Sequence, residues 1–387
     1  MRIAIISTVK SWGGSEELWT EMADVALKEG HEIILSLFQP ACTRPKVTQL
    51  QQQGARILPR PLGRPGKIGV LTYKYIFSFR KLFQTKPDVI FINLGGTYDP
   101  SRVNLSDLFK LLYKSAIPYV VICHCSEEIH VLNQPNVRDQ AIDFFKRAAS
   151  VLFVSQHNLK SAERQLAMTL PGTRIVRNPV NLTNLDLVPW TSSDTVRFAN
   201  VARLQVDSKG QDILLEALSL PVWQDRDWQL GLYGEGNDRL YLEKLARHYG
   251  IADRVKFYGH VKDIRQVWSE NDILVLPSRK EGTPLSLVEA MLCGRPMVVT
   301  DVGGNTEWVE EAKTGFVAEA PTAYSISAAL ERAYRAKPNW ETMGLLAHDT
   351  AFRKFDHDPG RSLLKLILQA ADQQAEQGAK ALSPLHC

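Results

Sequence analysis

The sequence lacks several features that would assign it to a membrane, secreted or dinucleotide-binding class. No run of about 18 apolar residues occurs in the 387-residue chain, so no membrane-spanning helix is expected. The first apolar run ends at Lys10, which is too short for the core of a secretion signal. Five cysteines form an odd set without framework spacing, which predicts reduced thiols in a cytoplasmic protein. No G-x-G-x-x-G fingerprint is present, so a dinucleotide site is not indicated.

Acidic residues are absent between Glu32 and Asp88, whereas ten basic residues lie there. Residues 1–180 carry 23 Lys/Arg against 14 Asp/Glu, and the rest of the chain carries 23 against 28. Such an excess of positive charge in one half favours an anionic partner through its summed field. Nucleic acid and an anionic membrane surface are both candidates at this point.

The apolar segments alternate with helical patterns in two successive series. Length predicts two or three domains, and 44% hydrophobic with 23% charged residues fits a soluble globular protein. Strand-like runs alternating with amphipathic stretches predict parallel sheets covered on both faces. The runs of the first series are "RIAIIST", "HEIILSLF", "PDVIFINLG", "IPYVVICHC" and "ASVLFVSQ", and those of the second are "VRFANVAR", "WQLGLYGEG", "DRVKFYGHV", "DILVLPS", "PMVVTDV" and "GFVAEA". The helices predicted in the second series are "KGQDILLEALSL", "DRLYLEKLARHYG", "IRQVWSEN" and "PLSLVEAMLCG". The pattern restarts after "RNPVN", so we expect an α/β protein with domains at 1–178 and 179–355, then a C-terminal helix and tail at 356–387. Ligands of open parallel sheets bind at the carboxyl ends of the strands, so two such domains predict a cleft for a large substrate.

The stretch "KEGTPLSLVEA" places two glutamates, Glu281 and Glu289, around the start of a predicted helix. Thr283 is predicted to cap that helix and Pro284 to occupy its first position. The amides that follow would then form an anion site, supported by the helix dipole. The alternative is an ordinary capped amphipathic helix with exposed glutamates, and spacing alone leaves both open.

Two cations, Arg203 and Lys209, stand between a predicted strand and helix in "NVARLQVDSKGQD". A phosphoryl leaving group needs charge compensation from a metal or from basic side chains, which such residues supply. Two solvated surface charges are the alternative.

In the first half, a Gly-Gly turn and a histidine follow predicted strands. Gly13 and Gly14 lie between the first strand and helix, where backbone can approach a phosphate closely. His124 ends the strand "VVICHC", so it is expected to point toward the ligand. Strand alternation places Cys123 and Cys125 on the opposite face, and C-x-x-C is absent, so no metal site is predicted.

Two further segments invite functional interpretations. "QDRDW" (Gln224 to Trp228) has the D-x-D pattern of some metal sites in Asp225 and Asp227, but it lies in a loop away from the expected ligand edge, and we predict no role for it. Residues 67–86 are aromatic and basic without acids, which suits either a membrane-surface helix or a helix packed on the sheet.

Together these motifs resemble the retaining glycosyltransferases of family 4, which have the GT-B fold. The resemblance rests on "GGSE", "ARL…KG", "LYGEG", "FYGHV", "EGTPLSLVEAM" as an E-x7-E element, "CGRPMVVTDVGGNTE" and "GFV", in this order. It implies two Rossmann-like domains facing across a deep cleft, with the C-terminal helix returning to the N-terminal domain. The N-terminal domain would bind the acceptor and the second domain the nucleotide-sugar donor. The linker departs from the family pattern, since Pro179 stands where glycine is frequent.

The resemblance also implies roles for the residues at the second domain's motifs. Glu289 would bind the donor ribose, and Glu281 would contact the donor sugar near its reacting carbon. Arg203 and Lys209 would hold the diphosphate. The helix start (Pro284, with the amides of Leu285 and Ser286) would help hold it, and Val261 would lie beside the base.

From the first domain, Gly13 and Gly14 would approach the phosphates and His124 would contact the donor sugar. No metal or other cofactor is implied. The expected reaction moves a hexose or N-acetylhexosamine from a nucleotide diphosphate sugar to an acceptor hydroxyl, as in the synthesis of cell-surface or lipid-linked glycans or polysaccharide. We expect an anionic or lipid-linked glycan acceptor and a cytoplasmic protein that contacts the inner membrane face peripherally.

Two other functions remain open from the sequence. A nucleotide-sugar epimerase of the same architecture would need no acceptor, although that family's own signature is not evident. A non-catalytic anion-binding protein would use the basic stretch 44–86, but no nucleic-acid motif is present and the second half is acidic, so no nucleic-acid partner is predicted.

Overall fold

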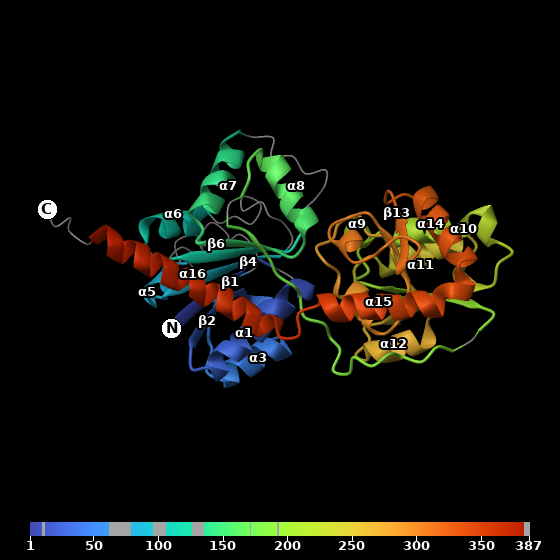
Figure 1. Cartoon of the computed structure of the whole chain (residues 1–387), viewed down its shortest axis with the longest axis horizontal. Coiled ribbons are helices and arrows are strands. Elements are labelled where there is room, and N and C mark those ends of the chain that lie inside the picture. The colour runs from blue at the N-terminus through green and yellow to red at the C-terminus, as the bar shows by residue number, and fades with distance from the viewer. Residues whose placement is uncertain are drawn as a thin grey trace. The chain divides into compact units, whose positions relative to one another are not determined.

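The computed structural model describes residues 1–9, 12–61, 79–95, 106–125, 135–170, 172–191 and 193–382. The chain divides into two compact units, Met1–Pro179 together with Asp356–Cys387, and Val180–Phe355. Each unit contains one wholly parallel sheet, as the alternating strand and helix patterns predict. Figure 1 shows helices on both faces of each sheet. The predicted α/β class with two parallel-sheet domains is confirmed.

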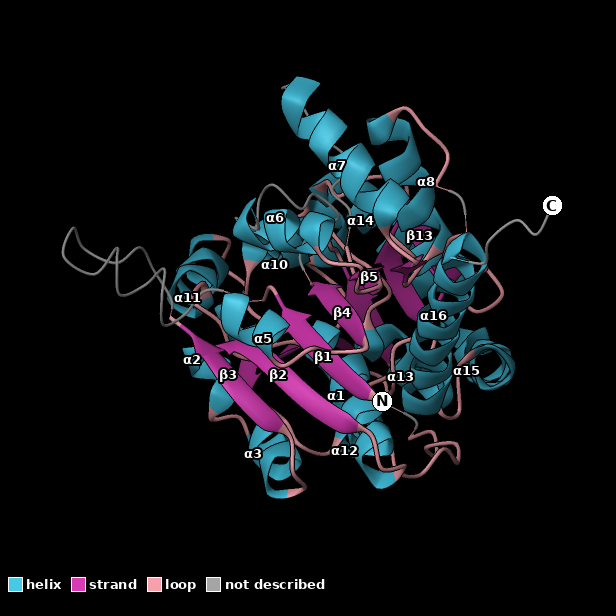
Figure 2. Cartoon of the chain, turned by 90° about the vertical axis from the view of Figure 1, so that its left-hand side faces the viewer, coloured by secondary structure: helices cyan, strands magenta, loops and turns pink. Residues whose placement is uncertain are grey.

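Among the described residues, the sheet of the first unit has seven strands in the order β3-β2-β1-β4-β5-β6-β7. Five of them coincide with the predicted strands, and the edge strands β3 and β7 are additions that apolar runs did not reveal. Figure 2 shows the strands from β3 to β5 side by side. Their bounds are β1 Arg2–Ser7, β2 Glu32–Phe38, β3 Arg56–Arg60, β4 Val89–Leu94, β5 Tyr119–Cys123, β6 Ser150–Phe153 and β7 Arg174–Ile175.

Two helical layers cover this sheet. Buried side chains of α1, α3 and α16 pack on one face. Those of α5, α6, α7 and α8 pack on the other. The bounds are α1 Gly14–Lys28, α2 Gln39–Cys42, α3 Pro45–Gln52, α5 Arg80–Gln84, α6 Ser106–Lys114, α7 Pro135–Arg147, α8 Gln156–Leu166 and α16 Pro359–Leu382. The prediction that the C-terminal helix returns to the N-terminal domain is therefore confirmed.

The second unit has six strands in the order β10-β9-β8-β11-β12-β13. All six were predicted from apolar runs, because strands buried on both faces read as short continuous hydrophobic stretches. Their bounds are β8 Val196–Val201, β9 Trp228–Tyr233, β10 Val255–Gly259, β11 Ile273–Leu276, β12 Met297–Thr300 and β13 Gly315–Ala318.

Helices α10, α11 and α14 pack on one face of this sheet. Helices α12, α13 and α15 pack on the other. Their bounds are α10 Gln211–Ser219, α11 Arg239–His248, α12 Ile264–Glu270, α13 Leu285–Leu292, α14 Ala323–Arg335 and α15 Trp340–Lys354, preceded in the chain by the short α9 Val206–Lys209.

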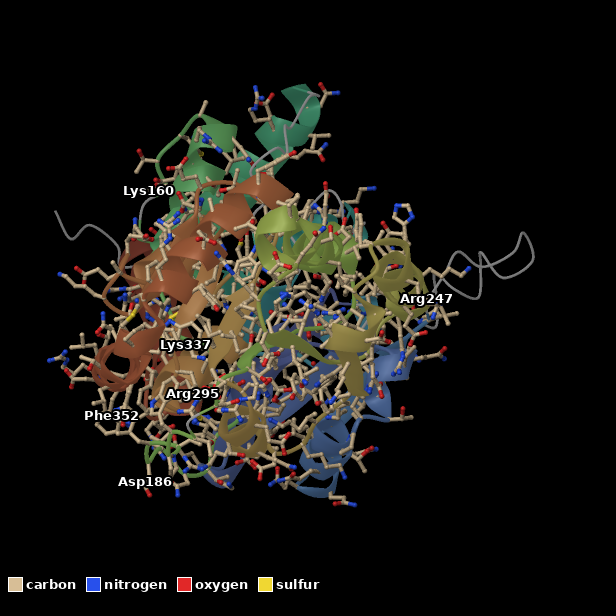
Figure 3. All side chains as sticks on the ribbon, turned by 90° about the vertical axis from the view of Figure 1, so that its right-hand side faces the viewer. Lys160, Asp186, Arg247, Arg295, Lys337 and Phe352 are labelled. Carbon is tan, nitrogen blue, oxygen red and sulfur yellow. The ribbon has the colours of Figure 1, made fainter. Side chains whose placement is uncertain are left out.

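Arg295 holds in place the segment of the second unit that precedes β8. Its guanidinium, only 1% exposed and labelled in Figure 3, donates to the carbonyl oxygens of Val188 and Pro189 at 2.9 Å and of Asn271 at 3.1 Å. It also stacks over the Trp190 ring. Burial lowers the pKa of Arg295 to about 10, but the carbonyl acceptors satisfy its charge. This arginine therefore has a structural role at the amino end of β12.

A cavity of about 300 Å³ lies in the first unit between α1, α3 and the start of α16. Its lining includes Glu21, Asp24 and Asp358 together with Lys46. Burial raises the pKa of the Glu21 carboxyl to about 7, and the neighbouring carboxylates add to the rise. Gly360 packs against the backbone of Glu21, so this group lies where α16 docks on α1.

We expect the free energy of unfolding to fall as pH rises from about 5 to about 8, in part because of Glu21. The folded pKa is raised above the unfolded value, so the folded state binds more protons between 4.5 and about 7 and loses stability through that window. Glu21→Gln removes this contribution, which we place on the order of 1–2 kcal/mol after allowing for solvent screening. Urea unfolding of both proteins at several pH values checks it, and parallel pH curves for both would contradict it.

Candidate functional site

The polar residues predicted for the donor follow strands at the carboxyl edge of the second sheet. In the order β10-β9-β8-β11-β12-β13 the chain reverses direction of winding between β8 and β11. Arg203 and Lys209 follow β8, and Glu281 follows β11. Ligands of open α/β sheets bind at such a switch point, outside the carboxyl ends of the strands. The topology thus brings these three residues to the edge where a ligand is expected.

Lys209 and Glu281 form an ion pair at this edge. The Lys209 Nζ lies 2.7 Å from Oε1 of Glu281, and Ser278 Oγ donates to the same oxygen at 2.7 Å. The Glu281 side chain is 5% exposed and that of Lys209 is 22% exposed. A carboxylate this deeply buried requires a partner, which Lys209 supplies. The pair therefore places one positive and one negative group in a fixed relation at the strand ends.

The loops that carry this pair are tied to each other. The backbone amides of Arg279 and Lys280 donate to the Ser208 carbonyl at 2.8 and 3.1 Å. The Arg279 guanidinium donates to both carboxylate oxygens of Asp212 at 2.7 and 2.8 Å. Gly210, at φ +66°, ends α9 where a Cβ would overlap the Pro277 carbonyl oxygen. The Lys209 segment is thus held against the Glu281 loop before any ligand binds.

A third loop, after β12, supports the Glu281 backbone. The Gly304 amide donates to the Gly282 carbonyl at 2.6 Å, and Thr300 Oγ1 donates to the Ser278 carbonyl at 2.7 Å. Gly303 has φ +58°, and a Cβ there would overlap the Glu281 carbonyl oxygen. Gly303 of "VGGNTE" is therefore required by the close approach of two backbone segments.

Helix α13 begins one residue later than predicted. Its N-cap is Pro284, and the helix runs from Leu285 to Leu292 with no side-chain capping bond. The prediction that Thr283 caps the helix is wrong, because extended φ and ψ angles place Pro284 outside the helix. The amides of Leu285 and Ser286 belong to the first turn, where backbone donors have no intrahelical acceptor. They can thus donate to an anion, as the sequence predicts.

Glu289 lies inside α13 and is 2% exposed. Its Oε1 accepts from the backbone amide of Asn181 at 2.9 Å and from the Asn181 side-chain amide at 3.0 Å. The alternative offered by the sequence, an ordinary capped helix with exposed glutamates, therefore does not hold for Glu289. This glutamate fixes the segment that opens the second unit, and no sequence motif predicts this contact.

Two further residues predicted for the donor site, Arg203 and Val261, also belong to this unit. Arg203 has an exposed side chain, and its carbonyl accepts from Gln211 Nε2 at 2.9 Å. Val261, just after β10, is partly buried and packs against the core under α12 and α13. Arg203 and Val261 both lie just beyond the end of a strand. Their roles, at the diphosphate and at the base, stay predictions.

In the first unit the predicted residues also follow strands at the carboxyl edge of their sheet. Gly13 is the N-cap of α1 and Gly14 its first residue. His124 follows β5, and its amide donates to the Leu94 carbonyl at 3.1 Å. Burial lowers the pKa of His124 to about 3, so its imidazole is neutral near pH 7. Within the described residues, its Nδ1 has no hydrogen-bond partner, which leaves that atom able to contact a ligand.

Groups that suggested metal binding do not assemble into a site among the described residues. Cys123 packs in the core, and His130 lies outside the described residues. Asp225 and Asp227 precede β9, at the amino end of the sheet, where Asp227 accepts from Thr195 at 2.5 Å. The prediction that this D-x-D pattern lies away from the ligand edge is confirmed.

Sequence reasoning gave no role to Glu16, although "GGSE" was one of its motifs. Glu16 is 2% exposed at the third position of α1, and its carboxylate accepts from Ser7, Ser15 and Asn93. A glutamate three residues after the N-cap is one half of a capping box, but the other half, a serine or threonine at the N-cap, is Gly13 here, so the sequence carries no complete signature for Glu16.

Comparison with known proteins agrees with this geometry. Residues 191–344 match the family model described as glycosyl transferases group 1. N-acetyl-alpha-D-glucosaminyl L-malate synthase of Bacillus anthracis is 29% identical over 367 residues, covering 90% of this chain and 92% of that protein. Poly(ribitol-phosphate) alpha-N-acetylglucosaminyltransferase of Staphylococcus aureus (strain COL) is 23% identical over 257 residues, covering 63% and 48%. The crystal structure of Anabaena Alr3699/HepE in complex with UDP-glucose has a TM-score of 0.69 at 21% identity, covering 98% of this chain and 100% of that one.

Proposed function

We propose that the chain is a retaining glycosyltransferase of family 4, because its residues 191–344 match the group 1 glycosyltransferase model and its fold is of the GT-B type. It transfers a hexose or N-acetylhexosamine from a nucleotide diphosphate sugar to an acceptor hydroxyl. The observation that carries this proposal is the buried Lys209–Glu281 pair at the switch point of the second sheet. Relatives whose names specify N-acetylglucosaminyl transfer, and a structural neighbour that holds UDP-glucose, support the donor class.

The residues at this edge suit a diphosphate that leaves the sugar. Lys209, Arg203 and the first-turn amides of α13 would compensate the negative charge that develops on the leaving phosphate. Glu281 would remain an ionised positioning group beside the sugar, held by Ser278 and Lys209. Glu289 would accept hydrogen bonds from the ribose hydroxyls. The acceptor hydroxyl would approach the same face, and the departing phosphate oxygen would take its proton.

No metal is required in this proposal, because cationic side chains and helix amides carry the charge compensation. We expect transfer to keep its wild-type rate after dialysis against EDTA. The assay is donor consumption with and without added Mg²⁺ or Mn²⁺. A loss of more than about tenfold on chelation, restored by one of these ions, would show that a metal does this work.

We also propose that the acceptor is an anionic or lipid-linked glycan. The protein would bind it in the cytoplasm, at the inner face of the membrane. Exposed basic side chains of the first unit support it: Arg44, Arg56, Arg80, Lys81 and Lys86. Arg60 does not contribute to this surface, because it is buried over the Phe38 ring. Most of the basic segment 67–86 lies outside the described residues. None of the helices within the described part of the chain is long and apolar enough to cross a bilayer. Co-sedimentation with vesicles tests the surface, and equal binding to neutral and anionic lipid would refute it.

A thermal-shift screen of UDP-glucose, UDP-galactose, UDP-N-acetylglucosamine and GDP-mannose tests the donor assignment. A ligand that binds only the folded state stabilises it in proportion to the logarithm of its concentration over Kd. We expect one donor to raise the melting temperature, and incubation with acceptors to release the nucleotide diphosphate. An epimer of the donor formed without any acceptor would instead identify the epimerase activity that the sequence left open.

A further inference from the structure

The N-terminus of α1 holds a buried carboxyl group to which neither the motifs nor the proposed mechanism gives a role. Glu16 is the third residue after the Gly13 N-cap, and its side chain is 2% exposed. Ser15 Oγ lies 2.7 Å from Oε2, and Asn93 Nδ2 and Ser7 Oγ lie 3.1 and 3.2 Å from Oε1. The carboxyl also accepts a backbone hydrogen bond from Gly13.

These bonds connect three segments at the carboxyl edge of the first sheet. Ser7 ends β1, Asn93 lies near the end of β4, and Gly13 is the N-cap of α1. The strands β1 and β4 are neighbours at the point where the order β3-β2-β1-β4-β5 reverses, so Glu16 lies at the switch point of this sheet. Asn93 Nδ2 also lies 3.3 Å from the Ser15 carbonyl oxygen. The carboxyl of Glu16 therefore sets the position of the turn that precedes α1.

We propose that Glu16 is a positioning residue that holds the Gly13–Gly14 turn ready for a phosphate group of a substrate, and that it does so in its uncharged form. This inference rests on the proposed function, in which that turn approaches a phosphate. An ionised carboxylate in direct contact with the turn would repel the same phosphate. A neutral carboxyl protonated on Oε2 avoids this repulsion: Oε1 still accepts from Asn93 and Ser7, and Oε2 donates its proton to Ser15 Oγ, whose hydroxyl then acts as the acceptor.

The surroundings of Glu16 support a neutral carboxyl. Burial raises its pKa to about 7, and the hydrogen bonds from Ser15, Ser7 and Gly13 oppose the rise. The charge of Glu17, on the same helix, also raises the pKa of Glu16. From β1 and β4, the uncharged side chains of Ser7 and Asn93 face the carboxyl. Glu17 itself contacts Lys46 and Trp12. Glu16 thus changes charge near neutral pH at the point where a phosphate is expected.

The test measures the KM for donor and for acceptor between about pH 6 and pH 8.5 in the wild type and in Glu16→Gln. The nucleotide-sugar is the one that gives the largest shift in the thermal screen, and its diphosphate carries a fixed charge over this range. We expect the wild-type KM of the phosphate-bearing substrate to rise about five- to tenfold as pH increases through 7, and Glu16→Gln to keep the low value throughout. Whether the donor KM or the acceptor KM moves identifies the source of the phosphate.

Glu21→Gln is the matched control, because Glu21 is also on α1 and also has a pKa raised to about 7. It should leave the KM profile of the wild type unchanged. Ser15→Ala is a second variant that serves if Glu16→Gln fails to fold. Loss of the Ser15 hydrogen bond raises the pKa of Glu16 further, so the midpoint of the KM profile should move to higher pH.

Two outcomes would overturn this inference, and they are distinguishable. In the first outcome, all three proteins (wild type, Glu16→Gln and Ser15→Ala) transfer the sugar with the same pH dependence of KM. The proposed function would then stand, and Glu16 would only cap the helix. Failure of every donor in the screen to bind would remove the proposed function and this inference with it.

Discussion

Lys209→Ala is expected to reduce the rate of sugar transfer about 100- to 1000-fold and to lower the free energy of unfolding as well. The rate falls because a cation that compensates the leaving diphosphate is lost, and removal of one preorganised electrostatic group has an effect of this size. Stability falls because Glu281, 5% exposed, loses the ammonium 2.7 Å from its Oε1. For a half-buried pair we expect a cost on the order of 1–3 kcal/mol. Urea unfolding and steady-state kinetics measure the two effects separately.

Lys313→Ala is the matched control, since Lys313 pairs with Glu310 at the surface, where both side chains are more than 60% exposed. Exposed pairs contribute little, so this variant should keep both rate and stability. Glu281→Gln keeps the size of the side chain and an acceptor for Ser278, and we expect it to lose transfer with less loss of stability. Wild-type kcat in both Lys209→Ala and Glu281→Gln would contradict the site.

Glu289→Ala is expected to raise the KM for the donor about 10- to 100-fold. The carboxylate is 2% exposed and would accept hydrogen bonds from the ribose, and bonds to a charged group contribute about 1.5–3 kcal/mol each. The variant also removes the acceptor of two hydrogen bonds from Asn181, so the segment that opens the second unit loses an anchor. Isothermal titration with the donor measures the affinity directly.

Two variants separate ribose binding from this structural contact. Glu289→Gln retains an oxygen for Asn181, and it should restore the stability of the fold while donor affinity remains reduced. Glu243→Ala removes a partly exposed helix glutamate that pairs with Arg239, and it should change neither quantity. A Glu289→Ala variant that binds donor as tightly as the wild type would show that this glutamate is structural.

The strands of the second unit could be predicted from sequence because most of them are buried on both faces and read as short apolar runs. The edge strand β10 is the exception, since Lys256 and Tyr258 are exposed there. In the first unit the same rule missed β3, because "RILPR" mixes charge and proline at a sheet edge, and β7, because it has two residues. Helices α14 and α15 were also not predicted. Backbone pairing and packing, not composition, define these elements.

The candidate site was predictable where a residue's place along the chain determined its place in space. Arg203, Lys209 and Glu281 follow strands, and parallel topology alone brings strand ends together. Contacts between segments distant in sequence were not predictable, such as that of Asn181 with Glu289. The helix start was displaced by one residue because Pro284 keeps an extended backbone.

The stereochemistry of the new glycosidic bond tests the central claim most directly. The wild-type enzyme is incubated with an α-linked nucleotide-sugar and a pooled set of sugar, polyol and lipid-linked acceptors, and the anomeric proton of the product is read by NMR. A retaining transferase of family 4 gives an α-linked product, and Lys209→Ala gives at most a trace of it. A β-linked product, or donor consumption without a new glycosidic bond, would contradict the account.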